Sequence, residues 1–270
     1  MSTIRRTIMG CNSGINTDDY LTFRASVNNF SVTFNLTGVG EGPEYCVDGN
    51  GIWKPLESGV SSETINEGQT ISIRAKLAPK NVLSGIGIFR GSKDYTLEGN
   101  VLSMIYGDDA PNNNSLADYS LVFYRLFYGE TTLRRISKNF LPATILGKQC
   151  YAQMFYACTK LLGTVYLPAT TLAQQCYQSM FYNTSISSAF LYARTPTTNC
   201  AMTMFSQCSK LSTIGVRFNT PLTNAYAFNW VDGVSSTGSF INGSGLTWTG
   251  VTYGPNGVPE GWELSNFEFD

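Results

Sequence analysis

Hydrophobic and polar residues alternate through the first third of the chain. Every second residue is apolar in the segment 30–36 (FSVTFNL), and the segments 21–25 (LTFRA) and 70–77 (TISIRAKL) show the same period of two. Such alternation is typical of β-strands with one buried face. Short runs of Gly, Asn, Asp and Pro, which favour turns, separate these segments. The pattern predicts a β-sandwich over residues 18–110 that ends at a linker near 107–115.

The residues before this alternation are polar and interrupted by Gly and Asn. They predict an arm, 1–17, that is either disordered or ordered by a partner. The arm contains the string IMGC, which resembles a lipid-attachment box, but only three residues separate Arg6 from Gly10. A signal peptide needs an apolar stretch of roughly 7–15 residues, and no run approaches the roughly 20 residues that span a bilayer. We therefore expect a soluble chain without membrane insertion and without a visible export signal.

Near residue 116 the pattern changes to a repeat. The string LPATILGKQCYAQMFY at 141–156 returns as LPATTLAQQCYQSMFY at 167–182, with eleven identities in sixteen positions. A Leu-Phe or Met-Phe pair marks each unit and recurs after steps of 28, 26 and 24 residues, beginning at Leu126, Met154, Met180 and Met204. Repeats of this length are typical of solenoids, in which neighbouring units cover each other's apolar faces. The repeat predicts a solenoid over 116–232 and a Gly-rich cap over 233–270.

Each repeat is predicted to combine one short strand with one short helix. The string LGTVYLPAT at 162–170 is typical of an extended segment that a proline then turns. Cys176, Tyr177, Met180 and Phe181 have the i, i+1, i+4, i+5 spacing of one helix face. The positions expected to pack between successive coils as the repeat core are Cys150, Met154, Phe155, Cys158, Cys176, Met180, Phe181, Cys200, Met204, Phe205 and Cys208.

The repeat is similar to that of a known group of proteins. Its consensus, LPATTLAxxCYxxMFxxCTxL, resembles the repeat of BspA-like leucine-rich-repeat proteins, and the tail WVDGVSSTGSF…GVPEGW resembles their C-terminal closing segment. In the front half, YCVDGNGIWKPL, INEGQTISIRAKL and LEGNVLSMIYGDD resemble the β-domain that often precedes such repeats. The resemblance covers about residues 20–265. The chain departs from the group at Thr184, where a cysteine is usual, and at 193–198, where ARTPTT replaces LPAT.

This resemblance implies a fold class and a biological setting. The implied fold is mainly β with short helices: an N-terminal β-sandwich, a short BspA-like leucine-rich-repeat solenoid and a C-terminal cap. Trp230 and Trp262 fall on the group's capping motif and are expected to close the open end. The group implies surface display and adhesion in gut Bacteroidales, and the same modules occur in virion proteins of the crAss-like phages that infect them.

The composition excludes several kinds of chemistry. The chain has no histidine, which removes the usual general base, the usual zinc ligand and every Ser–His or Cys–His nucleophile. The closest of its seven cysteines are eight residues apart, whereas zinc ligands come in pairs roughly two to four residues apart. Cysteines that recur once per repeat instead predict buried, reduced thiols. We therefore expect no metal, no cofactor and no catalytic residues.

Two pairs of adjacent aspartates, Asp18-Asp19 and Asp108-Asp109, are candidates for acid–base partners or for calcium ligands. Glycoside hydrolysis needs two carboxyl groups held roughly 5–10 Å apart in a cleft. Adjacent aspartates in loops rich in Gly, Asn and Pro point apart, which favours solvated caps instead. A carbohydrate-active enzyme is therefore only a third hypothesis.

Charge is unevenly distributed along a chain whose net charge is −1. Residues 1–130 carry 10 basic and 14 acidic side chains, 131–231 carry eight basic and none acidic, and the tail from Asp232 carries five acidic and none basic. The basic residues are spread along the repeats rather than clustered, which disfavours nucleic-acid binding. Docking onto anionic polysaccharide or onto the acidic part of a neighbouring copy explains the asymmetry better. The candidate ligand or partner contacts are Trp53, Arg134, Arg135, Lys148 and Arg194.

These patterns predict a non-enzymatic structural and adhesion protein. The favoured hypothesis is a bacteriophage virion component assembled in the host cytoplasm, such as a head or tail fibre, a decoration protein or a receptor-binding protein. Its expected partners are other virion proteins, further copies of itself, and a polysaccharide or protein of the host surface. The alternative is a BspA-like adhesin on the bacterial cell surface, which needs a route across the membrane, whereas lysis releases a virion protein.

Overall fold

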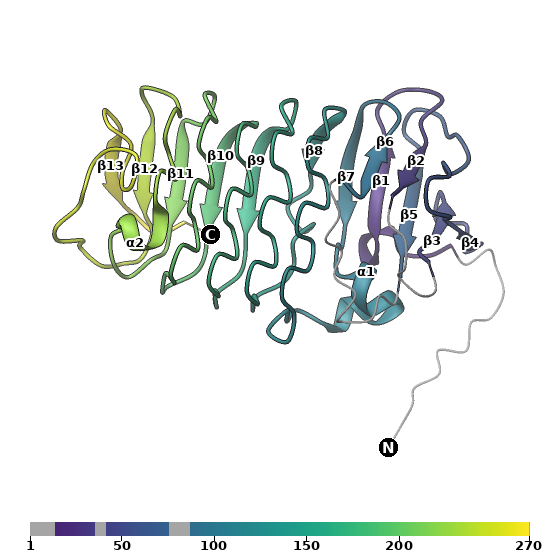
Figure 1. The fold of residues 1–270 in the computed structure, drawn as a ribbon, viewed down its shortest axis with the longest axis horizontal. Coiled ribbons are helices and arrows are strands. Elements are labelled where there is room, and N and C mark those ends of the chain that lie inside the picture. The colour runs from purple at the N-terminus through teal and green to yellow at the C-terminus, as the bar shows by residue number, and fades with distance from the viewer. Residues whose placement is uncertain (1–13, 36–41, 76–86, 270) are drawn as a thin grey trace, which may run out of the picture.

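The computed structural model describes residues 14–35, 42–75 and 87–269. The protein is mainly β, with 27% of its residues in strands and 7% in helices. It is elongated, and a stack of coils runs from an N-terminal unit to the C-terminal end (Figure 1). Of the predicted arm 1–17, residues 1–13 lie outside the described residues, and Thr17 already begins a 3-10 helix, η1 (Thr17–Asp19).

The N-terminal unit is built around a six-stranded sheet with the order β4-β3-β5-β1-β7-β8. Its strands are β1 (Leu21–Ala25), β3 (Glu44–Val47), β4 (Lys54–Pro55), β5 (Thr70–Arg74), β7 (Tyr95–Gly99) and β8 (Leu133–Ile136). Neighbouring strands are antiparallel except β7 and β8, which are parallel. A two-stranded sheet pairs β2 (Val32–Phe34) with β6 (Phe89–Gly91). Phe23 of β1 contacts Phe89 of β6, with ring centroids 5.7 Å apart.

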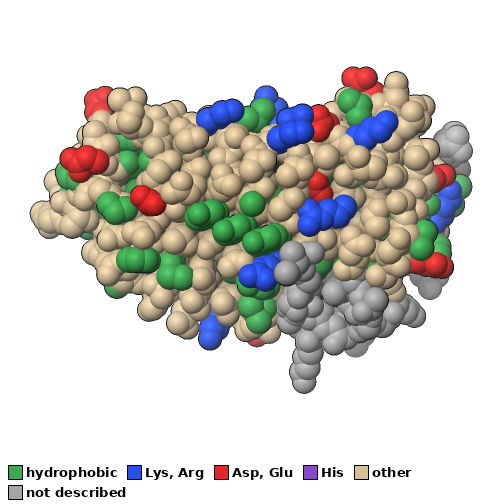
Figure 2. Space-filling model, turned by 45° about the horizontal axis from the view of Figure 1, so that its top comes forward, with side chains coloured by type: hydrophobic (Ala, Val, Ile, Leu, Met, Phe, Trp, Pro, Cys, Tyr) green, Lys and Arg blue, Asp and Glu red, His purple; other side chains and the backbone are tan. Residues whose placement is uncertain are grey.

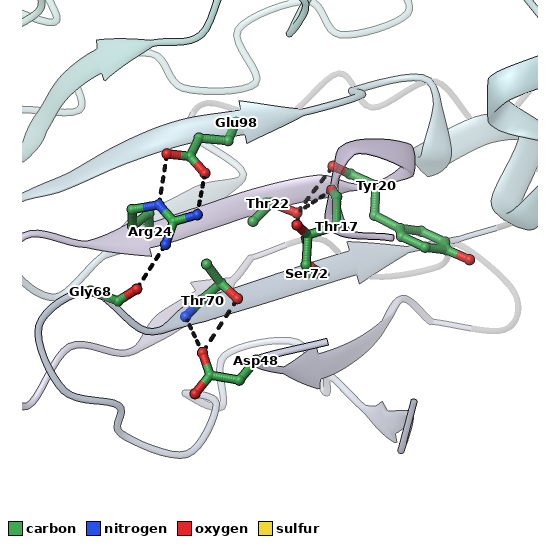
Figure 3. Close-up of polar contacts among 9 residues, drawn as sticks. All are labelled: Thr17, Tyr20, Thr22, Arg24, Asp48, Gly68, Thr70, Ser72 and Glu98. Atoms are coloured by element: carbon green, nitrogen blue, oxygen red, sulfur yellow. Dashed lines mark hydrogen bonds and ion pairs between the residues drawn. The ribbon is translucent and has the colours of Figure 1, made fainter. Parts of the chain in front are cut away.

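Polar side chains tie the central strand β1 to its two neighbours (Figure 3). Arg24 on β1 donates from Nε and Nη2 to the two carboxylate oxygens of Glu98 on β7, at 2.8 Å each. The hydroxyls of Thr22 on β1 and Ser72 on β5 share a hydrogen bond of 2.8 Å. Both hydroxyl residues are fully buried, and a buried hydroxyl is costly unless it is hydrogen-bonded. The pair therefore satisfies polar groups that the sheet removes from water.

The hydrophobic core continues from the N-terminal unit into the coils without a break. Phe127 contacts Phe23 and Phe89 of the two sheets, with ring centroids 6.1 Å apart in each case. It also stacks on Phe155 of the next coil at 5.5 Å. Strand β8 lies within the range 116–232 predicted as solenoid, yet it hydrogen-bonds to β7 of the N-terminal sheet. The two parts of the chain therefore share one apolar interior.

The segment 107–115, predicted as a linker, forms part of the folded junction. It follows the short helix α1 (Ser103–Tyr106) and begins with a 3-10 helix, η2 (Gly107–Asn112). Ala110 within it is fully buried. Its Gly, Asp, Pro and Asn residues favour tight turns, but their spacing does not reveal that the turns are packed.

The coils form a β-solenoid of about four turns, which confirms the stacked architecture that the repeat predicts. Its parallel sheet has the order β13-β12-β11-β10-β9. The strands are β9 (Leu162–Leu167), β10 (Ser185–Leu191), β11 (Thr213–Val216), β12 (Ser239–Asn242) and β13 (Glu263–Asn266), and the helix α2 (Asn224–Ala227) lies between β11 and β12. Val165, Ala189 and Ile214 are paired across β9, β10 and β11 and are buried. Equivalent strand positions thus fill one continuous inner layer.

The repeat segments predicted as helices are stacked turns instead. Residues in the left-handed backbone region recur every four positions: Gln149, Gln153 and Ala157 in one coil, and Gln175, Ser179 and Asn183 in the next. Every second N–H along 149–157 donates to a carbonyl of the next coil, as Tyr151 N does to Cys176 O at 3.0 Å, and the N–H groups between them close turns within the coil. The helix prediction is wrong. Residues i and i+4 lie on the same side of a chain of four-residue turns and also on the same side of a helix with about 3.6 residues per turn, so the spacing does not distinguish the two.

Candidate functional site

The predicted repeat core lies in the interior of the solenoid. The following side chains are all 0% exposed: Cys150, Met154, Phe155, Cys158, Cys176, Met180, Phe181, Cys200, Met204, Phe205 and Cys208. Their rings form a column, in which Phe155 stacks on Phe181 at 5.5 Å and Phe181 on Phe205 at 5.9 Å between centroids. Each ring covers the next, and full burial of such a side chain stabilises by about 1.5–3 kcal/mol.

The cysteines of the described chain are free and buried. Burial raises the pKa of the Cys150 thiol to about 12 and that of Cys208 to about 11. Cys208 Sγ lies 2.9 Å from the carbonyl oxygen of Phe181 and 3.3 Å from Oγ1 of Thr184. Since the thiolate is the nucleophile and the metal ligand, these thiols are held in the unreactive form. Thr184, where a cysteine is usual in the resembling repeats, places a hydroxyl in the same buried layer.

Tryptophan side chains fix the C-terminal segment to the coils. Trp230 has no exposed surface, and its indole Nε1 donates to the Gly257 carbonyl at 2.8 Å. Trp262 is 4% exposed and donates to the Ser235 carbonyl at 2.7 Å. Trp248, which lies outside the capping motif, makes an equivalent bond of 2.9 Å to the carbonyl of Phe218. These indoles pair with backbone, so none of them is presented to a ligand.

Trp53, predicted as an exposed contact, is partly buried in a polar network of the N-terminal unit. Its ring meets that of Tyr20 edge to face at 5.0 Å, and the Arg74 guanidinium lies 4.1 Å from the indole centre. Arg74 pairs with Glu44 at 3.0 Å and with Asp108 at 2.7 Å. Burial, followed by a hydrogen bond to Asp108, raises the pKa of the Tyr20 hydroxyl to about 12. Asp108 therefore joins this network, and its side chain stays 59% exposed, as its loop predicts.

The basic residues predicted as contacts are spread over three parts of the chain, with Arg134 and Arg135 adjacent on β8 and Lys148 and Arg194 on later coils. Arg134 on β8 pairs with Asp94, and Arg194, which is exposed, donates to the Ser244 carbonyl. Arg135 and Lys148 are exposed on β8 and on the turns of the following coil. Two of the four cations already have partners within the chain. On the face shown in Figure 2, Lys and Arg side chains lie over the middle and the N-terminal part of the molecule, and acidic side chains lie at both ends and beside some of the basic ones.

The outer face of the solenoid sheet carries an aromatic row that no sequence motif marks. Tyr166 on β9 and Phe190 on β10 are paired across the sheet and stack at 5.7 Å. The next residue in register, Gly215 on β11, has no side chain, and the tail residue Phe269 lies beside it, 5.1 Å from Phe190. At the other end, Lys138 Nζ lies 4.9 Å from the Tyr166 ring centre. We call these five residues the outer row. Their residue types differ from coil to coil, so the sequence repeat does not reveal them.

A hollow of about 410 Å³ opens beside the outer row. Its walls include Lys138, Leu141, Pro142, Tyr166, Pro168 and Tyr192. Most of these side chains are apolar or aromatic, and Lys138 brings a charge. The hollow therefore favours a ligand with an apolar ring and a nearby anionic group.

A second aromatic column lies along the turns. The rings of Tyr128, Tyr156 and Tyr182 are nearly parallel, with centroids 4.8 and 4.6 Å apart, and all three side chains are partly exposed. The Arg125 guanidinium lies 5.2 Å from the Tyr128 ring centre and donates from Nε to Gln153 at 2.6 Å. Burial, with the neighbouring tyrosines, raises the pKa of the Tyr156 hydroxyl. The column therefore presents neutral hydroxyls at a spacing set by the coils.

The described parts of the chain contain no group of three or more Cys, Asp or Glu side chains placed to hold a metal ion. Within the same ranges, no helix is both long enough and apolar enough to cross a membrane. The fold is that of a β-solenoid continuous with a β-rich N-terminal unit. No family model matches the chain, and no curated protein or solved structure matches it either.

Proposed function

We propose that this chain is a non-enzymatic structural and adhesion protein that displays its solenoid to a ligand. The observation that carries the proposal is the alignment of partly exposed aromatic rings in successive coils, along the turns and on the outer sheet face. Such rows offer stacking surfaces at fixed spacing, whereas the buried thiols are neutral and unavailable as nucleophiles. This combination suits holding a ligand better than transforming one.

The finer architecture belongs to the same proposal. We take the N-terminal unit to be a β-sandwich, which the contact of Phe23 with Phe89 between its two sheets supports. We take residues 233–270 to be a cap, which the hydrogen bonds of Trp230 and Trp262 support. The assignment to BspA-like leucine-rich repeats rests on the repeat consensus.

The setting we propose is a bacteriophage particle, with the N-terminal unit attached to other virion proteins and the solenoid facing outward. The resemblance to modules of crAss-like phage virions supports it, as does the elongated shape with the two parts at opposite ends (Figure 1). Self-association through the acidic tail and the basic repeats would strengthen attachment.

Mass spectrometry of purified phage particles tests this setting, with electron microscopy of labelled particles to locate the chain. We expect the chain at a constant copy number per particle. Its absence from particles, together with its release by protease from intact bacteria, would support the cell-surface adhesin instead. For the carbohydrate-active alternative, incubation with a panel of host glycans is expected to show binding without turnover, and the appearance of shortened products would refute the non-enzymatic proposal.

A further inference from the structure

The tail of the chain shows how the outer face holds an aromatic ring. Phe269 lies 5.1 Å from Phe190 and 5.6 Å from Tyr192 between ring centroids, and the Arg217 guanidinium lies 5.1 Å from its ring. Arg217 also donates to the backbone carbonyl of Phe269. Gly215 provides the room, because a Cβ at that position would come within 3.0 Å of the Phe269 ring. The site that holds this ring, which we call the Phe269 seat, thus consists of the space beside Gly215, the rings of Phe190 and Tyr192, and the Arg217 guanidinium.

The hollow beside Tyr166 lies one coil earlier. Like the Phe269 seat, it lies between the outer-face residues of the strands and the residues that directly follow those strands. Tyr166 and Phe190 are paired on neighbouring strands, and Pro168 and Tyr192 each follow their strand directly. Tyr192 belongs to both places, since it lines the hollow and contacts Phe269. The hollow is therefore a continuation of the Phe269 seat, with walls of the same chemical kind.

Charge favours an acidic occupant. Lys138 lines the hollow beside Tyr166, and the segment 131–231 contains eight basic residues and no acidic one. The tail that fills the neighbouring seat has the sequence FEF, in which Glu268 is flanked by two phenylalanines. An extended peptide presents alternate side chains to one face, so that a ring can enter a pocket while carboxylates flank it.

We infer that the hollow binds an extended, acidic segment of a partner protein. An aromatic side chain of that segment packs between Tyr166, Pro168 and Tyr192, and the carboxylates of the segment face Lys138. The inference rests on the proposed function and deepens it, because it names the kind of partner that the displayed solenoid holds.

Fluorescence anisotropy with a labelled peptide tests the inference on the full chain. The probe has the sequence of residues 263–270, ELSNFEFD, and we expect it to bind saturably. Tyr166→Ala and Lys138→Glu each weaken binding at least about tenfold, as does a probe with serine in place of both phenylalanines. Lys138 is exposed, so its substitution leaves the fold intact. Tyr253→Ala removes an aromatic ring that is 53% exposed and lies outside the hollow and both aromatic rows, so it is the control and changes affinity by less than about twofold.

A Phe269→Ala variant separates the hollow from the seat of the tail. Affinity within about twofold of the parent chain supports the hollow. Tighter binding in Phe269→Ala with no loss in Tyr166→Ala means that the peptide only displaces the tail, which overturns the inference. Binding of cellohexaose or maltohexaose that Tyr166→Ala abolishes, with no binding of the peptide, overturns it in favour of a sugar. A negative peptide result leaves the particle mass spectrometry unaffected, so the two proposals fail separately.

Discussion

Phe155 and Phe181 occupy the same place in consecutive coils, with ring centroids 5.5 Å apart and ring planes 13° apart. The backbones are joined as well, since Phe155 N donates to the carbonyl of Met180 at 3.0 Å. Neither ring has exposed surface. Each apolar layer is made of side chains from two neighbouring coils that cover each other, so the coils are stable as a stack.

Truncation of a ring inside this column is expected to be severely destabilising. Phe181→Ala removes contacts with the coils on both sides and leaves a cavity, which costs about 3–5 kcal/mol of the free energy of unfolding. Phe267→Ala is the matched control, because Phe267 is 53% exposed and its loss changes stability by less than about 0.5 kcal/mol. Urea denaturation followed by circular dichroism measures both. Equal stability of the two variants would contradict the stacked core.

The stacked four-residue turns of the coils, which we call the turn ladder, predict different effects of glycine at two adjacent glutamines. Gln175 has a φ of 58°, where glycine is favoured over other residues by about 1 kcal/mol. Gln175→Gly is therefore neutral or stabilising, whereas Gln174→Gly, outside that region, costs about 0.5–1 kcal/mol. Thermal melting of the two variants measures the difference. A loss of about 1 kcal/mol in both variants would instead indicate a helix.

The stacked architecture and its core were predictable from the sequence, because the coils repeat the residues that they bury. The local backbone was not: Met154 and Cys158 have a four-residue spacing that suits a helix and a turn ladder equally. The outer row was hidden for a different reason. Phe269 fills a place that Gly215 leaves open, and this contact joins residues far apart in the sequence with no shared motif.

The pKa values of the buried thiols predict a loss of stability in alkali. Burial raises the pKa of Cys150 to about 12 and that of Cys208 to about 11 from an ordinary value of 9.0. The folded chain therefore keeps protons that the unfolded chain releases above pH 9, so the free energy of unfolding falls as pH rises from about 9 toward 11–12. Each such thiol contributes at most about 1.4 kcal/mol per pH unit.

Urea denaturation between about pH 8 and pH 10 checks this dependence. Cys150→Ala in a Cys11→Ser background is expected to show a shallower decline than the background alone. In the same background, a thiol reagent such as Ellman's reagent is expected to react only as the chain unfolds. Fast reaction with the folded chain would contradict the buried, protonated state of the thiols.

Glu130 predicts a charge-compensation effect at the junction of the N-terminal unit and the coils. Its carboxylate is 3% exposed, accepts from Thr132 N at 3.0 Å and lies 3.7 Å from Arg90 Nη1. Arg90→Met removes the nearby cation and is expected to cost about 1–3 kcal/mol. The double variant Arg90→Met/Glu130→Gln recovers part of that loss, as a thermal denaturation cycle measures. A double variant no more stable than Arg90→Met alone would show that the two charges are not coupled.

Disulfide trapping between coils tests the central claim most directly. Ser188 on β10 is paired with Thr213 on β11, and Thr213 is paired with Ser239 on β12. Adjacent strands lie roughly 4.8 Å apart, within reach of a disulfide, and strands two apart lie beyond the roughly 7 Å limit between Cα atoms. Stacked coils predict that Ser188→Cys/Thr213→Cys forms an internal disulfide under mild oxidation and that Ser188→Cys/Ser239→Cys does not, as mass spectrometry of the non-reduced chain reports. Equal cross-linking in both pairs, or none in the first, would contradict the account.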